Sequence, residues 1–181
     1  MTEEMDNFPG EEEMNTETDF NLDDEYKEEP LAPVGSYFGA IRKVSFESSN
    51  NAIAWEIVAN GNQGMLMADG TTQIDGAVFW YRNWLPRPGD ENIRTKSGRS
   101  TKRQAKINML KRFQDDMRID MNTPESVKEA IMNQEWLGIP VVFTVDIEEY
   151  EGRTRNNIKK IARTDEDIEL PQPADDDDIP F

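Results

Sequence analysis

The apolar residues that a folded core needs are confined to the middle of this 181-residue chain. Residues 34–163 hold aromatic and β-branched residues in short alternating runs, whereas residues 1–33 and 164–181 are strongly acidic. The net charge is −12 for residues 1–33, +3 for residues 34–163 and −8 for residues 164–181. A highly charged segment with few apolar side chains cannot bury enough surface to offset its chain entropy. We therefore expect one domain over residues 34–163, a disordered acidic arm over 1–33 and a flexible acidic tail over 164–181.

Cysteine and histidine are both absent from the chain. Their absence excludes disulfides, thiolate and imidazole metal sites, and catalytic triads built on histidine or cysteine. A nuclease that uses the tail aspartates with Mg²⁺ is disfavoured, because a flexible tail gives a metal no rigid scaffold. No apolar run approaches the roughly 20 residues of a membrane span, and the acidic start of the chain is unlike a signal peptide. We expect a cytoplasmic protein that is not an enzyme and has no cofactor or metal.

Periodicity divides the middle of the chain into β and helical segments. Residues 35–47, 52–60 and 74–85 are typical of strands, and residues 101–117 place apolar side chains at helical spacing. Thr123 and Pro124 predict the start of a second short helix, with Ser126 in place of the acid of a full capping box. Residues 139–150 and 153–163 then form a hairpin around a tight turn at Glu151 and Gly152.

This order is that of a mainly β protein with a helical insert. The string β-β-β-α-β-β predicts the OB-fold, a five-stranded, partly open barrel that binds oligonucleotides. A five-stranded barrel of the SH3 type or a small α+β sandwich is compatible with the same order.

The tail ends in a run of four aspartates followed by Ile-Pro-Phe. Phe181 offers a ring and a carboxylate to one apolar pocket edged by a base, Pro180 limits the entropy lost on docking, and the aspartates favour basic partner surfaces. The predicted partner-binding residues are Asp175, Asp176, Asp177, Asp178, Ile179, Pro180 and Phe181. The alternative is a tail that only keeps the protein soluble.

These seven residues resemble the acidic C-terminal tip of bacterial and phage single-stranded DNA-binding proteins. That resemblance implies docking to replication, recombination and repair proteins. The segments GSYFGAIRKV and YEGRTRNNIKKI are similar to small phage-encoded OB-fold proteins that bind single strands. The long acidic arm is a departure, because bacterial single-stranded DNA-binding proteins generally lack one.

Bases are concentrated between Arg82 and Arg112, where ten Lys and Arg face two acids. Residues 94–103 contain no apolar side chain and favour a flexible loop that follows a phosphate chain. Its predicted DNA contacts are Arg94, Lys96, Arg99, Lys102 and Arg103. The alternative is a solvated loop and helix face.

Strand alternation places Trp80, Arg82 and Trp84 on one face, and Phe79 and Tyr81 on the other. An arginine between two tryptophans is unlike a core, since an unpaired buried guanidinium is costly. We therefore assign Trp80 and Trp84 to base stacking. The alternative puts Trp80 in the core and twists the strand at Arg82.

Two further predictions concern the first and last strands. Trp55 is assigned to the core. Tyr37 and Phe38 point opposite ways in the first strand, so one of them is available to stack a base, and we assign this role to Tyr37 rather than Phe38. The last strand places Arg153, Arg155 and Lys159 on one polar face with Asn157, a row suited to phosphates. A bulge or the strand end must intervene there, because Ile158 and Ile161 do not share a face.

The function expected from these features is sequence-independent binding of single-stranded DNA in replication, recombination or repair, inside a bacterial cell or phage-infected host. The alternative is a protein-interaction module of a replication complex that does not touch DNA. Self-association, the preference for DNA over RNA and the role of the acidic arm stay open.

Overall fold

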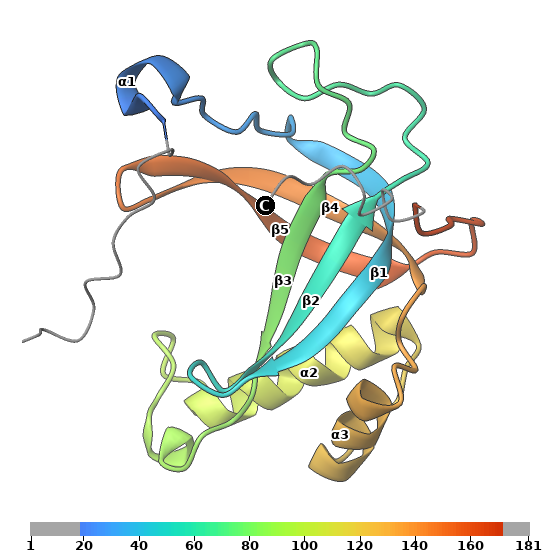
Figure 1. Cartoon of the computed structure of the whole chain (residues 1–181). Coiled ribbons are helices and arrows are strands. Elements are labelled where there is room, and N and C mark those ends of the chain that lie inside the picture. Colours follow the sequence, from blue (N-terminus) through green and yellow to red (C-terminus); the bar gives the residue numbers. More distant parts are fainter. Residues whose placement is uncertain (1–18, 172–181) are drawn as a thin grey trace, which may run out of the picture.

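Five strands form one antiparallel sheet in the order β3-β2-β1-β4-β5. The computed structural model describes residues 19–171. The strands are β1 (Gly35–Glu47), β2 (Ala52–Ala59), β3 (Val78–Trp84), β4 (Pro140–Tyr150) and β5 (Arg153–Arg163). The sheet is strongly curved, so that β4 and β5 cross over β2 and β3 in Figure 1, and β3 also contacts β5. The predicted mainly β architecture with a helical insert is confirmed.

The strand bounds follow the sequence pattern closely except in β3. This strand begins at Val78 rather than at residue 74, although Ile74 is buried in the loop that precedes it. The hairpin turn has positive φ at both Glu151 (50°) and Gly152 (77°), the backbone that favours a tight turn between strands. The predicted Glu151-Gly152 turn is therefore confirmed.

A bulge in β5 explains why its apolar residues lack a regular period. Thr144 pairs with Lys160 and the next residue, Val145, pairs with Ile158, so that Lys159 is extra. The inserted residue brings both Ile158 and Ile161 into the core.

β2 lies at the centre of one half of the sheet and is buried along its whole length. It pairs with β1 on one side and β3 on the other. A Cβ on Gly39 of β1 would lie 2.6 Å from the carbonyl oxygen of Val58, so glycine permits the close approach of β1 and β2 there.

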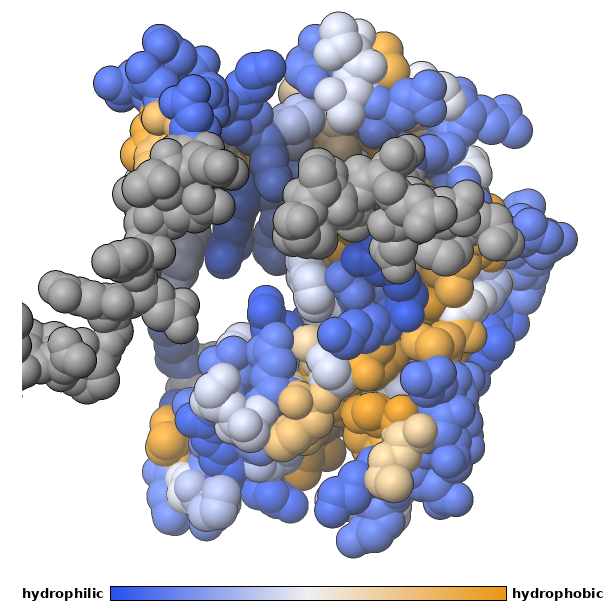
Figure 2. Space-filling view, viewed as in Figure 1, coloured by the Kyte–Doolittle hydropathy of each residue, from blue (hydrophilic) through white to orange (hydrophobic). Residues whose placement is uncertain are grey.

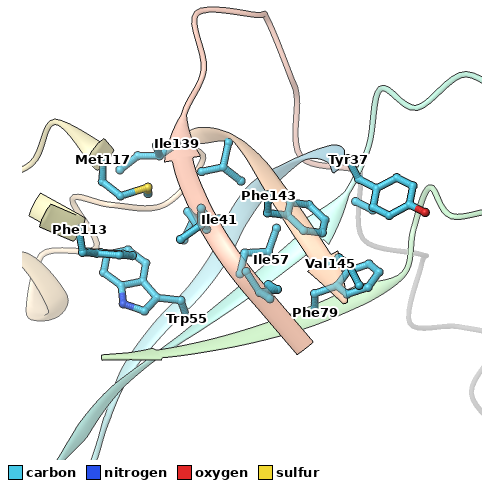
Figure 3. Close-up of a cluster of buried hydrophobic side chains, with 14 of the residues drawn as sticks. Tyr37, Ile41, Trp55, Ile57, Phe79, Phe113, Met117, Ile139, Phe143 and Val145 are labelled. Atoms are coloured by element: carbon cyan, nitrogen blue, oxygen red, sulfur yellow. The ribbon is translucent and has the colours of Figure 1, made fainter. Parts of the chain in front are cut away.

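The core fills the concave side of the sheet (Figure 3). Tyr37 lies at one end of this cluster, and Trp55, Phe113 and Met117 lie at the other. The Trp55 ring stacks on Trp136 at 5.2 Å and makes a tilted contact with Phe113 at 5.0 Å. Its indole nitrogen donates a 2.6 Å hydrogen bond to Asn83 Oδ1 of β3. The prediction that Trp55 is a core residue is confirmed.

Two helices between β3 and β4 close the end of the sheet that holds Trp55 (Figure 1). α2 (Lys102–Met117) begins at Thr101, whose side chain accepts from the Gln104 N–H, and it buries Phe113 and Met117. Met109, one of the apolar residues at helical spacing in this segment, is nevertheless 60% exposed. The short 3₁₀-helix η1 (Asp90–Asn92) precedes α2.

α3 (Pro124–Met132) begins as predicted, with Pro124 in its first turn. The Thr123 side chain accepts from the Ser126 N–H, and the Ser126 side chain accepts from the Thr123 N–H. Ser126 therefore completes a capping box at the position where the full motif has an acid.

The described part of the acidic arm is attached to the domain. It contains the short helix α1 (Leu22–Glu25), and the Ala32 N–H donates to Asn156 Oδ1 at 2.8 Å. This end of the arm differs from the disorder that its composition predicts. Within residues 19–171, none of the helices combines the length and apolar character needed to cross a bilayer.

Removing the acceptor of the Trp55 indole tests what holds β3 to the core. Asn83→Ala should lower the free energy of unfolding by about 1–3 kcal/mol, because it leaves a buried N–H without a partner. Urea denaturation measures the loss. In a Trp55→Phe background the same change should cost clearly less, and equal costs in both backgrounds would contradict this role of the hydrogen bond.

Candidate nucleic-acid interface

The outer face of β3 presents two tryptophans on either side of an arginine. Trp80 is 49% exposed and Trp84 is 48% exposed. Ala54 and Ala52 of β2 pair with Arg82 and Trp84, and both alanines are buried. Small side chains in this part of β2 leave room for the larger groups of β3 above them. The predicted outer face is confirmed.

The inner face of β3 also follows the predicted alternation. Phe79 is buried, and the Tyr81 ring stacks on Phe113 at 5.5 Å with 6° between the planes. Burial raises the pKa of Tyr81, and the carboxylate of Asp116 adds to this effect. Tyr81 therefore packs against α2 and is not part of the exposed face.

Arg82 is held in place by an ion pair. Its Nε lies 3.0 Å from Glu47 Oε2, at the end of β1. Hydrogen bonds from Arg82 and then from Asn50 hold the pKa of Glu47 below its usual value. The guanidinium is therefore positioned between the two tryptophans, but a phosphate that binds it must compete with Glu47.

A groove of about 620 Å³ lies between β3 and α2, and we call it the β3–α2 groove. It includes the side of β3 that carries Trp84, and its apolar lining comes from Ile93, Met109 and Leu110. No described carboxylate lines it. Its basic residues are Arg82, Arg87, Arg94, Lys96, Lys102 and Lys106. The groove therefore combines an aromatic ring, an apolar floor and positive charge.

The basic loop beside this groove, which the sequence predicted to be flexible, makes several main-chain hydrogen bonds. Arg94 bridges Thr101, the Thr95 N–H donates to the Ser100 carbonyl at 2.9 Å, and the Gly98 N–H donates to the Thr95 carbonyl at 2.8 Å. The Lys102 N–H reaches the Ile93 carbonyl at 2.7 Å and joins the loop to α2. Backbone hydrogen bonds thus fix the loop, with Arg94 and Lys96 lining the groove.

Arg99 and Arg103, also predicted to contact DNA, line neither this groove nor the one described below. Their positions, within the loop and on the first turn of α2, leave them at the surface. The structure brings together Arg94, Lys96 and Lys102 but not the complete predicted set.

Asp90 binds bases that line the β3–α2 groove. It is 3% exposed and accepts from Lys106 Nζ at 2.7 Å and from the Arg87 N–H at 2.8 Å. The Lys106 hydrogen bond, and then the one from Arg87, hold the pKa of Asp90 below its usual value. Lys106 is mostly buried and also donates to the Leu85 carbonyl, so it acts as a structural cation.

A second groove, of about 1150 Å³, lies between β3 and β5, and we call it the β3–β5 groove. Trp80 and Arg82 line one part, and Arg153, Arg155 and Asn157 line another. Arg82 lines both grooves, so the two meet along β3. Figure 2 shows this face hollowed to the left of centre, with mainly hydrophilic residues around the hollow.

Acidic neighbours compensate the basic row predicted on β5. Arg155 forms an ion pair with Glu148 at 2.7 Å and lies over the Tyr150 ring at 4.2 Å. Lys159 lies 2.7 Å from Asp146. Their hydrogen bond lowers the pKa of Asp146 and raises that of Lys159.

Lys159 does not line the groove with the rest of its predicted row. The bulge at this residue breaks the alternation that the prediction assumed.

Tyr37 does not present a stacking surface. It is 1% exposed, its hydroxyl donates to the Pro33 carbonyl, and burial raises its pKa. Its ring packs beside Phe143 in the core. The prediction that Tyr37 stacks a base is therefore wrong for this conformation.

The predicted partner-binding residues 175–181 lie outside the described part of the chain. The preceding residues run back along the sheet, where Asn60 Nδ2 donates to the Glu169 carbonyl at 2.7 Å. The Ile168 side chain lies against Gly61, where a Cβ would be 2.7 Å from its Cδ1. Part of the predicted flexible tail is thus in contact with the domain.

Sequence reasoning missed the residues that make the β3–α2 groove a cavity. Arg87 and Ile93 come from the loop after β3, where no periodicity marks their direction, and the buried Asp90 of the same loop holds Lys106 of the groove. The dipeptide Pro88-Gly89 before an acid was the only signal of a structured turn.

No protein-family model matches the chain, and no curated protein matches it significantly. Among residues 19–171 there is no group of three or more acidic, cysteine or histidine side chains placed to hold a metal ion. The described face presents indole rings, on which flat groups can stack, and Arg and Lys side chains, which attract anions.

The interactions of Asp90 make the stability of the folded domain depend on pH. Its pKa is lower in the folded chain than its ordinary value of 3.8, so its stabilising effect is complete above that value and is lost as the pH falls through the folded pKa. Asp90→Asn should lower the melting temperature at pH 7, and its difference from the wild type should shrink below about pH 4. The exposed carboxylate of Asp116 provides the control, because Asp116→Asn removes no ion pair seen in residues 19–171. If the difference in melting temperature between Asp90→Asn and the wild type is the same at pH 7 and pH 3, the stabilising role of the Asp90 carboxylate is contradicted.

Proposed function

We propose that this protein binds single-stranded DNA without sequence preference and without catalysis. The observation that carries the proposal is the outer face of β3, where Trp80 and Trp84 stay about half exposed on either side of Arg82. Burying these indoles in the core would have stabilised the domain, so their exposure favours a ligand-binding role. Nucleobases of every kind offer flat faces to such rings.

The fold supports the proposal as an open barrel of the OB type. β1 pairs with both β2 and β4, the main helix lies between β3 and β4, and β3 contacts β5. These connections are compatible with the five-stranded OB arrangement, in which oligonucleotides lie across the second and third strands and the neighbouring loops. In this proposal the single strand lies across β3 and the two grooves beside it.

Trp80 and Trp84 are too far apart to hold one base between them. Four residues of a β-strand span about 13 Å, whereas stacked bases lie about 3.4 Å apart. Each indole therefore takes its own base, and the backbone between them passes Arg82. Arg94 and Lys96 continue the positive charge on one side, and Arg153 continues it on the other.

The proposed setting is replication, recombination or repair, as the resemblance of residues 175–181 implies. In this proposal the tip recruits partner proteins while the barrel holds the strand. Deleting residues 175–181 should then abolish partner capture and leave the strand bound.

Removing the indoles tests the stacking face. Trp80→Ala and Trp84→Ala should each weaken binding of a dye-labelled oligo-dT by about 1–3 kcal/mol, the usual loss for one base–aromatic stack. Fluorescence anisotropy measures the affinity, and circular dichroism checks the fold. Phe46→Ala is the matched control, since Phe46 is equally exposed but lines neither groove. If both folded Trp variants bind oligo-dT as tightly as the wild type, this face does not bind DNA. If neither the wild type nor any variant binds oligo-dT, the result favours a protein-interaction module instead.

Salt dependence tests the phosphate contacts of the β3–α2 groove. Arg94→Gln combined with Lys96→Gln should flatten the plot of log affinity against log salt by roughly 1.4, at about 0.7 per contact with a single strand. Lys128→Gln combined with Lys160→Gln removes the same charge from exposed positions outside both grooves and should leave the slope unchanged. Equal slopes for the two variants would contradict the assignment.

A further inference from the structure

The described part of the acidic arm lines the β3–β5 groove. Tyr26, Glu28, Glu29, Pro30 and Leu31 all contribute to it, on the same groove as Trp80 and Arg153. In Figure 1 this segment runs from α1, near the tip of the β4–β5 hairpin, to the start of β1. One of the two grooves beside β3 is thus partly lined by a segment from before the barrel.

Hydrogen bonds anchor the segment where it leaves the groove. Asn156 of β5 accepts from the Ala32 N–H at 2.8 Å and donates to the Ala32 carbonyl at 2.9 Å. The Ala68 N–H donates to the Leu31 carbonyl at 2.7 Å. These bonds satisfy backbone groups on two neighbouring residues, so residues 26–30 are tethered beside the groove whatever their own contacts are.

The segment carries the chemical features of the proposed ligand. Glu28 and Glu29 supply negative charge, and Tyr26 supplies an aromatic ring that is largely exposed. Within residues 19–171, no ion pair joins either glutamate to a base, and none involves Arg153. Outside this segment the groove is lined by three arginines and by two glutamates, Glu47 and Glu148, so Glu28 and Glu29 more than offset its remaining positive charge. They do so without an ion pair, which leaves the segment exchangeable.

We propose that residues 26–30 compete with single-stranded DNA for the β3–β5 groove. This inference rests on the proposed function. A tethered segment acts at an effective concentration near the millimolar range, so weak contacts suffice for partial occupancy. The apparent dissociation constant rises by the inverse of the fraction of molecules with an open groove. The β3–α2 groove has no such occupant among the described residues, so DNA meets that groove first.

The competition predicts that neutralising the two glutamates strengthens binding. Glu28→Gln combined with Glu29→Gln should bind oligo-dT about threefold more tightly than the wild type at low salt, if the segment fills the groove two thirds of the time. The advantage should fade at high salt, where charges are screened. Glu166→Gln combined with Asp167→Asn changes the net charge equally at exposed positions outside both grooves and is the control.

A measurement without DNA separates occupancy of the groove from simple repulsion of DNA. In a Trp84→Phe background Trp80 is the one exposed tryptophan of the described domain, because Trp55 and Trp136 are buried. Acrylamide, which is uncharged, should quench Trp80 fluorescence more strongly after the glutamate substitutions than after the control substitutions.

Equal affinity of the two charge variants, or unchanged quenching, would overturn the competition. If no variant binds oligo-dT, the proposed function fails and the competition with DNA fails with it. Stronger quenching in that case would show that the segment occupies the groove for another reason, so the two failures are distinguishable.

Discussion

The register between β2 and β3 decides which side chains of this protein face solvent and which form its core. With Ala54 opposite Arg82, the tryptophans of β3 lie outside and Phe79 lies inside. A shift by one residue would exchange the two faces and bury the arginine. The hydrogen bond from Trp55 to Asn83 opposes such a shift, because a slipped strand would remove the acceptor from a buried indole. Core packing and the proposed binding face therefore depend on the same alignment.

Several basic side chains of the domain are already paired with carboxylates, so fewer of them can attract an anion than their number suggests. Arg82, Arg155 and Lys159 are paired with carboxylates, and Lys106 is held by a buried aspartate. In the β3–α2 groove, Glu47 or Asp90 pairs with three of the six bases, and Arg87, Arg94 and Lys96 have no carboxylate partner among the described residues. A chain with a net charge of −17 thus keeps a local concentration of bases on one face by placing most of its acids elsewhere.

Much of this architecture could be predicted from residue order because strands and helices have short periods. Alternation located the faces of β3 and the burial of Trp55, and capping residues located the start of α3. Tyr37 was misassigned because its neighbour Phe38 is equally apolar, and only the curvature of the sheet decides between them. The loop around Gly98 is fixed by main-chain hydrogen bonds, which leave no trace in side-chain composition. Pairs such as Arg82 with Glu47 join residues that lie 35 positions apart, beyond the reach of any local pattern.

The complete burial of β2 has a consequence for how this protein can change over evolutionary time. Each of its side chains meets either the core or the groups that lie over the outer face, so β2 admits few substitutions of different size. The residues of β3 that face solvent carry no such restriction, since exchanging an exposed indole disturbs little packing. The proposed ligand-binding face can therefore diverge on β3 while β2 preserves the sheet, which would separate the evolution of specificity from that of stability.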